Sequence, residues 1–331
     1  MVDSADDCTE ENRVARQRAT GRKGIIVIGS FANLFGVMAF LTVPREAIWS
    51  YSVAGVVFAV GLAMIFLRGD WQKARGLEKV ILFGPIFYAA PLAAFGTEHF
   101  TFTAAIASMV PAFVPWHMFW AYFIGGCFIV AALSMVTGIL ARVAASLVAL
   151  NFFLFVMLMD LPAWLQDPRD RIALTLVLRE LTFSGGALAL AASLTTGPAR
   201  ERIAHIMATI ARYFVAIPVV FYSFEQFMHG DHVPGVPLER LTPTWIPGHA
   251  IWTYVAAVGY LVAGIPLLLG KKTRAAAAWV GLTVLFVELI VYVPIGVADR
   301  ASIVGLNFVF DTLMFCGSVL LLARAMPRET P

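Results

Sequence analysis

The chain has 331 residues, of which 60% are hydrophobic and only 14% are charged, whereas soluble domains average about 45–50% and about 25%. This composition excludes a soluble enzyme with a polar surface and a disordered chain. The long apolar runs do not alternate with polar residues, which argues against a transmembrane β-barrel. The formal net charge of +3 is too small to indicate binding to nucleic acid.

Ten apolar runs follow a polar stretch at residues 1–23, and each is long enough to cross a bilayer as a helix. The predicted spans are 24–43, 50–68, 79–98, 118–137, 142–162, 172–194, 207–228, 249–269, 275–296 and 302–323. The run at 102–113 is too short to span, so it is expected to lie at the interface or to re-enter the membrane. The predicted fold is therefore an all-α, polytopic transmembrane bundle.

Lysine and arginine predict the orientation of these spans. Of the 24 such residues, 18 fall on one side of the membrane, five fall on the other, and Arg179 lies inside a span. Cytoplasmic loops carry the excess of lysine and arginine. Both termini are therefore predicted to be cytoplasmic, and the expected location is a bacterial-type cytoplasmic (inner) membrane.

An internal repeat is the strongest signal in the chain. A stretch that contains GTEHF, VPAFVPWHMFWAY and RELTFSGG recurs as YSFEQF, TPTWIPGHAIWTY and FDTLMFCG. Matching residues are 127 apart before the first outer loop, where Glu98 aligns with Glu225, and 132 apart after it. Near the end of each copy they are 131 apart, which aligns Glu180 with Asp311 and leaves Arg179 without a charged counterpart.

Each copy is expected to form a four-helix unit. Both copies begin on the same side of the membrane, so the repeat should be parallel, with an axis along the membrane normal. The predicted division is a cytoplasmic tail at 1–23, an N-terminal helix pair at 24–78, and two repeats at 79–206 and 207–331.

These motifs resemble the DoxX-like family of membrane proteins. The resemblance rests on E-H-F at a helix end, on V-P-x-h-(I/V)-P-x-H-x-x-W-x-Y (h is apolar), and on a G-x-x-x-R hairpin followed by an acidic residue before a glycine-rich helix. The first copy fits best, because the second has Gln226 where the first has His99. The resemblance implies a four-helix membrane unit, present here twice, and a link to quinone-coupled sulfur oxidation or to membrane oxidoreductase complexes.

Ionisable side chains inside a membrane are costly and are candidates for function. Those expected to carry chemistry are Glu98, Glu180, Glu225 and Asp311, with Glu288 and Asp160 also in the outer half of the bundle. In one interpretation these acids line a pocket open to the outer face, and they relay protons or bind a quinone headgroup. In the other they are held by partners such as Arg179, which is expected to pair with Glu98 or Asp160 and not with its neighbour Glu180.

Residues expected to contact a cofactor or headgroup are His99, His117, Trp120, Arg179, His249 and Trp252. No histidine pair at matched depth suggests a haem between two spans. A metal near the outer surface, held by His99, His117 and Glu98 or by Glu225, His229, Asp231 and His232, has weaker support, and none is predicted. The three cysteines form no CxxC motif, so a thiol–disulfide relay is not expected.

Three functions remain open at this point. The first is a subunit or accessory of quinone-linked or other membrane redox chemistry, which would need a bound quinone or a redox protein partner, because the chain carries no visible electron carrier. The second is a transporter for a small solute or for protons, favoured by the duplication. The third is a non-catalytic anchor within a larger complex. The sequence leaves open whether the chain is an enzyme at all.

Overall fold

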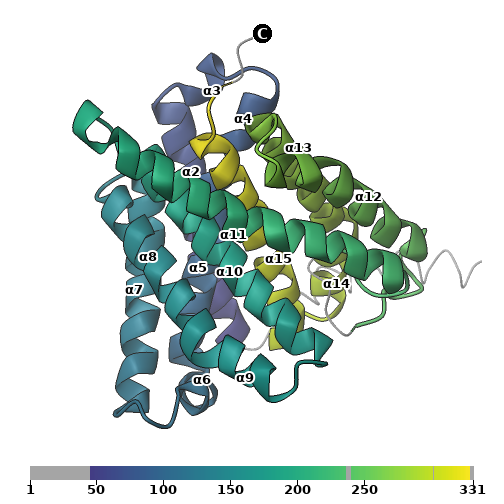
Figure 1. Cartoon of the computed structure of the whole chain (residues 1–331). Helices are drawn as coiled ribbons and strands as arrows, with labels where there is room; N and C mark the ends of the chain where they lie inside the picture. The colour runs from purple at the N-terminus through teal and green to yellow at the C-terminus, as the bar shows by residue number, and fades with distance from the viewer. Residues whose placement is uncertain (1–44, 236–239, 301, 329–331) are drawn as a thin grey trace, which may run out of the picture. The chain divides into compact units, whose positions relative to one another are not determined.

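The fold is a bundle of long helices. The computed structural model describes residues 45–235, 240–300 and 302–328, so the predicted tail at 1–23 and the predicted first span at 24–43 lie outside it. Within the described residues, nine helices are long and apolar enough to cross a membrane (Figure 1). Each overlaps one of the other nine predicted spans, which confirms the prediction of a polytopic all-α bundle.

The described helices before the first repeat are α2 (Arg45–Leu67), α3 (Asp70–Lys73) and α4 (Leu77–Ile81). The first repeat comprises α5 (Gly84–Thr101), α6 (Thr103–Met109), α7 (His117–Thr137), α8 (Ala141–Phe155), the π-helix η2 (Val156–Asp160), α9 (Leu161–Gln166) and α10 (Arg171–Ser193). After the short helix η3 (Pro198–Arg200), the second comprises α11 (Glu201–Met228), α12 (His249–Leu268), α13 (Thr273–Val287), the π-helix η4 (Glu288–Tyr292), α14 (Val293–Ala298) and α15 (Ile303–Ala325).

The helix bounds reproduce the repeat and correct its register at the end. From α7 onward, every helix of the first repeat begins 132 residues before its counterpart, and this includes the π-helical turn. The same spacing relates α10 to α15, where the sequence motifs suggested 131. The structural counterpart of Asp311 is therefore Arg179, and Glu180 corresponds to Thr312.

Helix contacts support this register. Gly185 on α10 packs against Val215 of α11, and its counterpart Gly317 on α15 packs against Tyr88 of α5. The hydroxyl of Ser184 donates to Ala149 O, and the thiol of its counterpart Cys316 donates to Gly281 O. All these residues except Tyr88 and Val215 are related by 132, and those two are related by the 127 that applies before the first outer loop.

Equivalent residues of α10 and α15 meet each other, which locates the pseudo-twofold axis. A Cβ atom built on Gly186 would lie 2.5 Å from the Cα of its counterpart Ser318. Two helical turns earlier, Arg179 contacts its counterpart Asp311. Since two equivalent pairs meet about 10 Å apart along the helices, the axis runs along the helices, and the two repeats are parallel.

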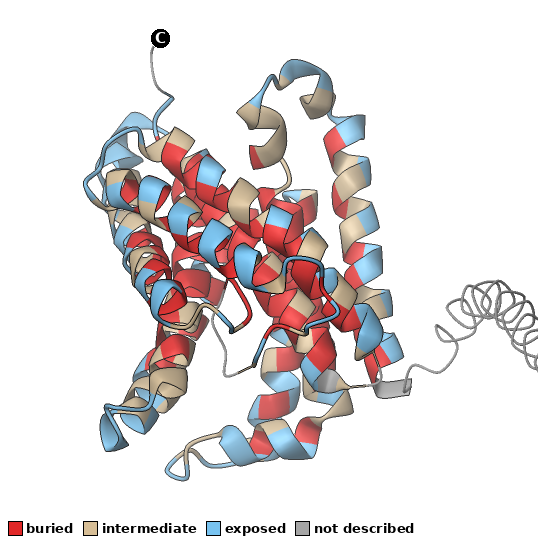
Figure 2. Ribbon diagram, turned by 90° about the vertical axis from the view of Figure 1, so that its right-hand side faces the viewer, coloured by how far each residue is buried: buried red, intermediate tan, exposed pale blue. Residues whose placement is uncertain are grey.

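Helices α5 and α15 are the most enclosed helices of the bundle, and the outer helices face lipid with apolar residues. Buried residues make up 78% of the most apolar part of α5 and 83% of that of α15, but only 28% of the corresponding part of α8. Figure 2 shows this contrast, with buried positions gathered on the inner helices. The outer faces carry exposed aromatic and aliphatic side chains such as Trp120, Tyr122 and Trp279. An ionisable group at a buried position of α5, α10 or α15 is therefore shielded from both lipid and water.

Candidate functional site

Arg179 on α10 lies at the centre of a buried ionic cluster. Its Nη1 is 2.6 Å from Oδ2 of Asp311 on α15, and its Nη2 is 3.0 Å from Oε1 of Glu180. The three side chains are only 17%, 11% and 14% exposed. The expectation that Arg179 pairs with Glu98 or Asp160 and not with Glu180 is wrong, because its long side chain folds back to its neighbour and also reaches α15.

Two further carboxyl groups interact with these three side chains. Glu98, near the end of α5, interacts electrostatically with Asp311, and Asp160, the last residue of η2, does so with Arg179. Buried oxygens that have no hydrogen-bond partner in residues 45–235, 240–300 and 302–328 remain on Glu98 (Oε1), Asp160 (Oδ2) and Glu180 (Oε2). We call Glu98, Asp160, Arg179, Glu180 and Asp311 the axial cluster.

The axial cluster holds four carboxyl groups and one guanidinium group. If every member were ionised, three negative charges would remain uncompensated in a part of the bundle with little water. Each uncompensated charge would cost several kcal/mol. The arrangement therefore favours protons, or hydrogen-bond donors from a bound molecule, on the carboxyl oxygens that lack partners.

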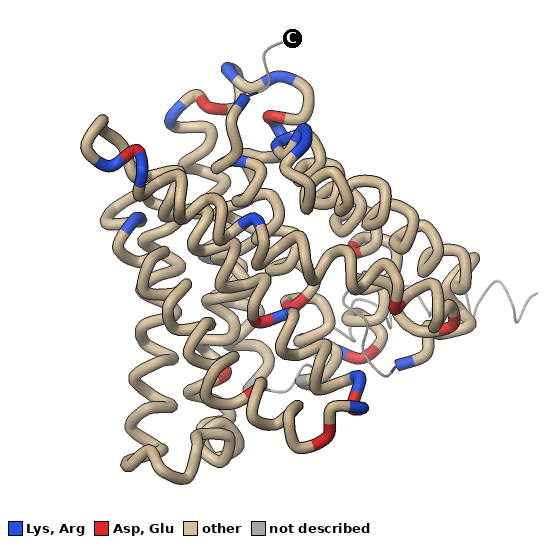
Figure 3. The backbone as a smooth tube through the Cα atoms, in the orientation of Figure 1, with Lys and Arg blue, Asp and Glu red and all other residues tan. Residues whose placement is uncertain are grey.

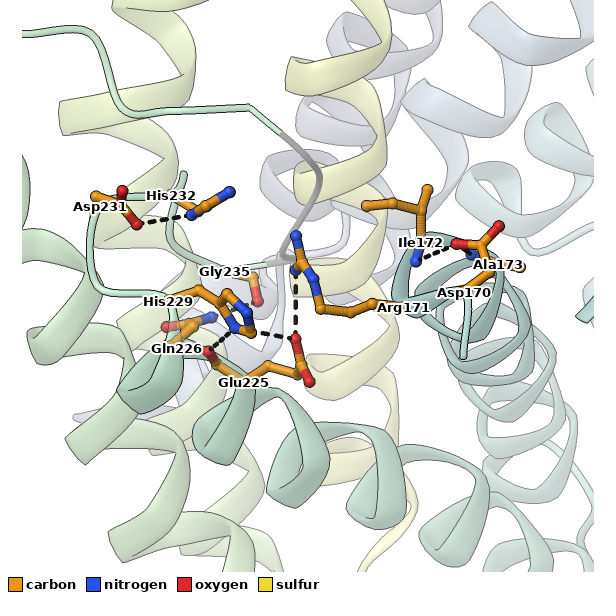
Figure 4. Close-up of polar contacts among 10 residues, drawn as sticks. All are labelled: Asp170, Arg171, Ile172, Ala173, Glu225, Gln226, His229, Asp231, His232 and Gly235. Atoms are coloured by element: carbon orange, nitrogen blue, oxygen red, sulfur yellow. Dashed lines mark hydrogen bonds and ion pairs between the residues drawn. The ribbon is translucent and has the colours of Figure 1, made fainter. Parts of the chain in front are cut away.

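Glu225 belongs to a separate ionic group at the end of α11 (Figure 4). Its Oε2 is 3.3 Å from Nη1 of Arg171 and 3.5 Å from Nδ1 of His229. Arg171 opens α10, directly after Asp170, which accepts hydrogen bonds from the backbone N–H groups of Ile172 and Ala173. The counterpart of Arg171 in the second repeat is Ile303, which cannot form an ion pair. Glu98 and Glu225 therefore share a place in the repeat but not a set of partners.

Glu288 is a third kind of acid, because it is buried alone. It opens η4, is 2% exposed, and neither of its carboxyl oxygens has a hydrogen-bond partner in the part of the chain that the structure describes. Its counterpart in the first repeat is Val156. The hydroxyl of Tyr260, also fully buried, has no hydrogen-bond partner either. The π-helical turn thus places one polar side chain in the apolar interior of the second repeat, and π-turns often occur at functional sites.

We expect Glu288→Gln to leave the stability of the protein unchanged or to raise it slightly. The amide has the shape of the carboxylic acid and cannot ionise, so the variant avoids the cost of a buried unpaired charge. Thermal unfolding of the purified variants in detergent tests this. Glu288→Ala is the contrasting variant, since it removes buried atoms and should destabilise the protein by about 2 kcal/mol or more. A loss of stability in Glu288→Gln as large as that in Glu288→Ala would contradict the prediction.

The predicted histidine and tryptophan contacts do not meet in one place. His117 and His249 each begin a helix, α7 and α12, one in each repeat. Trp120 is 37% exposed and contacts neighbouring aromatic rings of α7 edge to face. Trp252 donates its Nε1 hydrogen to Pro247 O. These positions are those of an aromatic belt at the membrane surface.

His99 lies next to Glu98 on α5 but serves the packing of α5 on α7. Its Nδ1 is 2.7 Å from Phe95 O, and its ring contacts the ring of Phe128 edge to face. Its counterpart Gln226 donates from Nε2 to Gly235 O. Of the six residues predicted to contact a cofactor, Arg179 alone is a member of the axial cluster.

The turn at His229–His232 holds an ion pair at the surface. His232 Nδ1 lies 2.8 Å from Oδ1 of Asp231, and this hydrogen bond lowers the pKa of the Asp231 carboxyl from its ordinary value. Nowhere in the described residues do three or more His, Cys, Asp or Glu side chains form a group that could hold a metal ion.

Neither of two cavities in the described part of the chain is lined by a member of the axial cluster. One has a volume of about 600 Å³ and the other about 90 Å³, and both are lined by residues near the ends of α3, α4 and α15. The predicted pocket that opens from the acids to the outer face remains a prediction.

Comparison with known proteins gives one match. Residues 207–293, from α11 to the start of α14, match the sequence profile of the DoxX family, which confirms the resemblance drawn from the motifs. The matched residues lie in the second repeat, although the motifs are more complete in the first. No curated protein and no solved structure matches the chain.

Proposed function

We propose that this membrane protein, a DoxX-like chain whose residues 207–293 form the matched domain, takes up and passes on protons within the bilayer as a subunit or accessory of quinone-linked redox chemistry. We also propose that it lies in a bacterial-type inner membrane, with its Lys- and Arg-rich end in the cytoplasm. Any electron carrier would come from a bound quinone or from a redox protein partner.

The observation that carries the proposal is the excess of carboxyl groups around Arg179. Oxygens of Glu98, Asp160 and Glu180 are buried and have no hydrogen-bond partner among the described residues. Reduction of a quinone consumes two protons, and carboxylic acids next to a quinone oxygen can donate them. Chains of buried acidic side chains are a recurrent means of moving protons in membranes.

Quinone binding and proton exchange can be measured on the purified full-length chain in lipid nanodiscs. We expect an organic extract to contain quinone above the level in empty nanodiscs, and infrared difference spectra to show a carboxyl band that changes when the quinone is reduced. Glu180→Gln and Glu98→Gln should remove that change and slow quinone-linked proton uptake about 100-fold or more. Glu201→Gln, an exposed acid at the start of α11, is the matched control and should behave as the wild type.

Quinone at background level together with an unresponsive carboxyl band would overturn the redox proposal. Proton transport is the second candidate, favoured by the parallel repeats and by the ion pair on their axis. In proteoliposomes with a pH gradient, transport predicts a proton flux without any quinone that is lost in Asp311→Asn. Stable co-purification with redox proteins, unaffected by all these variants, would instead favour the anchor.

A further inference from the structure

The cavity of about 600 Å³ lies at the end of the bundle opposite the outer loops, between α3, α4 and the start of α13. Its lining combines charged residues with apolar ones, and the charged ones are Asp70, Lys73, Arg75, Glu78, Arg274 and Arg328. Figure 3 shows that lysine and arginine gather at this end of the molecule. We call this feature the basic cavity.

Two of the cations near the basic cavity already have acidic partners. Arg274 binds Glu78 with two hydrogen bonds of 2.7 and 2.6 Å, and it also donates to the carbonyl groups of Ala323, Arg324 and Met326 at the end of α15. Asp70 interacts electrostatically with Arg324. Both acidic residues of the cavity lining, Glu78 and Asp70, therefore already interact with a cation.

Three cations of the lining remain available to a ligand. Within the described ranges Lys73 makes one hydrogen bond, of 3.3 Å to Arg68 O, and no ion pair with an acid. Arg75 is exposed and has no acidic partner among the described residues. Arg328 lies 3.9 Å from Glu78, already bound by Arg274, and its side chain is 83% exposed. The cavity therefore carries a surplus of positive charge.

The rest of the lining is apolar. Leu77, Ile81 and Leu82 of the α4 region and Ala275 and Ala278 of α13 cover the side of the cavity that continues into the membrane-spanning helices. Cations above an apolar floor suit a molecule with a charged head and an apolar body. The predicted orientation places this end in the cytoplasmic leaflet, where anionic lipids give the surface a negative potential.

We propose that the basic cavity binds a phosphate-bearing anionic headgroup, with Lys73, Arg75 and Arg328 around the phosphate and the apolar floor against the chain that the headgroup carries. The phosphate chemistry is shared by an anionic phospholipid and by a soluble phosphate ligand, and the apolar floor favours the lipid. This site is separate from the axial cluster and does not depend on the proposed function.

Native mass spectrometry of the full-length protein, titrated with phosphatidylglycerol and with zwitterionic phosphatidylcholine, tests the proposal. We expect one phosphatidylglycerol to bind in preference to phosphatidylcholine. Lys73→Gln combined with Arg75→Gln should weaken that binding roughly 30-fold, because each cation near a membrane surface is worth about fivefold in affinity. The matched control combines Arg200→Gln with Arg202→Gln, two exposed cations at the same end that do not line the cavity, and it should bind as the wild type.

A parallel titration with inorganic phosphate distinguishes the two sources. Binding of the lipid that inorganic phosphate does not displace identifies a lipid site. Binding of inorganic phosphate alone, lost in the Lys73/Arg75 variant, identifies a site for a soluble phosphate ligand and supports the same cavity. Equal losses in the cavity variant and the control would mean a general attraction of charge and would overturn the proposal. Unchanged binding in the cavity variant would do the same.

Discussion

Arg179→Gln is expected to destabilise the protein by about 3–5 kcal/mol, because removal of one partner leaves Asp311 and Glu180 as buried groups without a counter-charge. Both acids contact the guanidinium from the inner helices α10 and α15, where little water is available to replace it. Reversible unfolding of the purified protein in mixed micelles, titrated with a denaturing detergent, measures the loss.

Two further variants separate the ion pairs from other roles of Arg179. Combining Arg179→Gln with Asp311→Asn and Glu180→Gln removes the charges of the three side chains that contact one another, and most of the lost stability should return. Arg171→Gln is the matched control, since Arg171 also binds a buried acid, Glu225, but its own side chain is 20% exposed and its contact is 3.3 Å. Its loss should be smaller, and an equal loss would contradict the central position of Arg179.

Gly317→Ala should separate two of the most enclosed helices and destabilise the protein by about 2–3 kcal/mol. A Cβ atom at this position would meet the backbone of α5, at 2.6 Å from the carbonyl carbon of Phe87 and closer still to the nitrogen of Tyr88. Backbone atoms cannot rotate away, so α15 would have to move. The same unfolding titration measures the effect.

Gly126→Ala on α7 is the control for this substitution. No heavy atom of another described residue lies within 4 Å of a Cβ built on Gly126, and alanine is favoured over glycine in helices by about 1 kcal/mol. We therefore expect Gly126→Ala to be neutral or slightly stabilising. Similar losses in the two variants would show that the approach of α15 to α5 does not decide the result.

The spans and the repeat were predictable because both depend on patterns within single segments. Apolar runs bounded by charges predicted each described span, and the recurrence of the motifs predicted two parallel units. The register of the last helix was not predictable in the same way. Sequence comparison aligned the acid Glu180 with the acid Asp311, whereas the close approach of Gly186 to Ser318 sets the helices one residue differently. That single residue decides which side chains meet on the axis.

The candidate site was predictable only in part, for a related reason. Glu98, Glu180 and Asp311 were named from their cost in a membrane, but their partners depend on contacts between helices far apart in sequence. The ion pairs of Arg171 with Glu225 and of Arg179 with Asp311 follow from the packing of α10 against α11 and α15. Buried tyrosines that donate across helices, Tyr88 to Phe183 O and Tyr222 to Thr175 O, carried no signal in their apolar runs.

The position of Arg179 opposite Asp311 has a consequence for any assembly of separate halves. Two identical subunits related by a true dyad would bring the same residue to both sides of it. Arginine would then face arginine, or aspartate would face aspartate, and like charges would repel each other inside the bundle. A salt bridge across the dyad requires two halves with different residues at this position. Because both halves are part of one polypeptide, each half always meets the other and never a copy of itself.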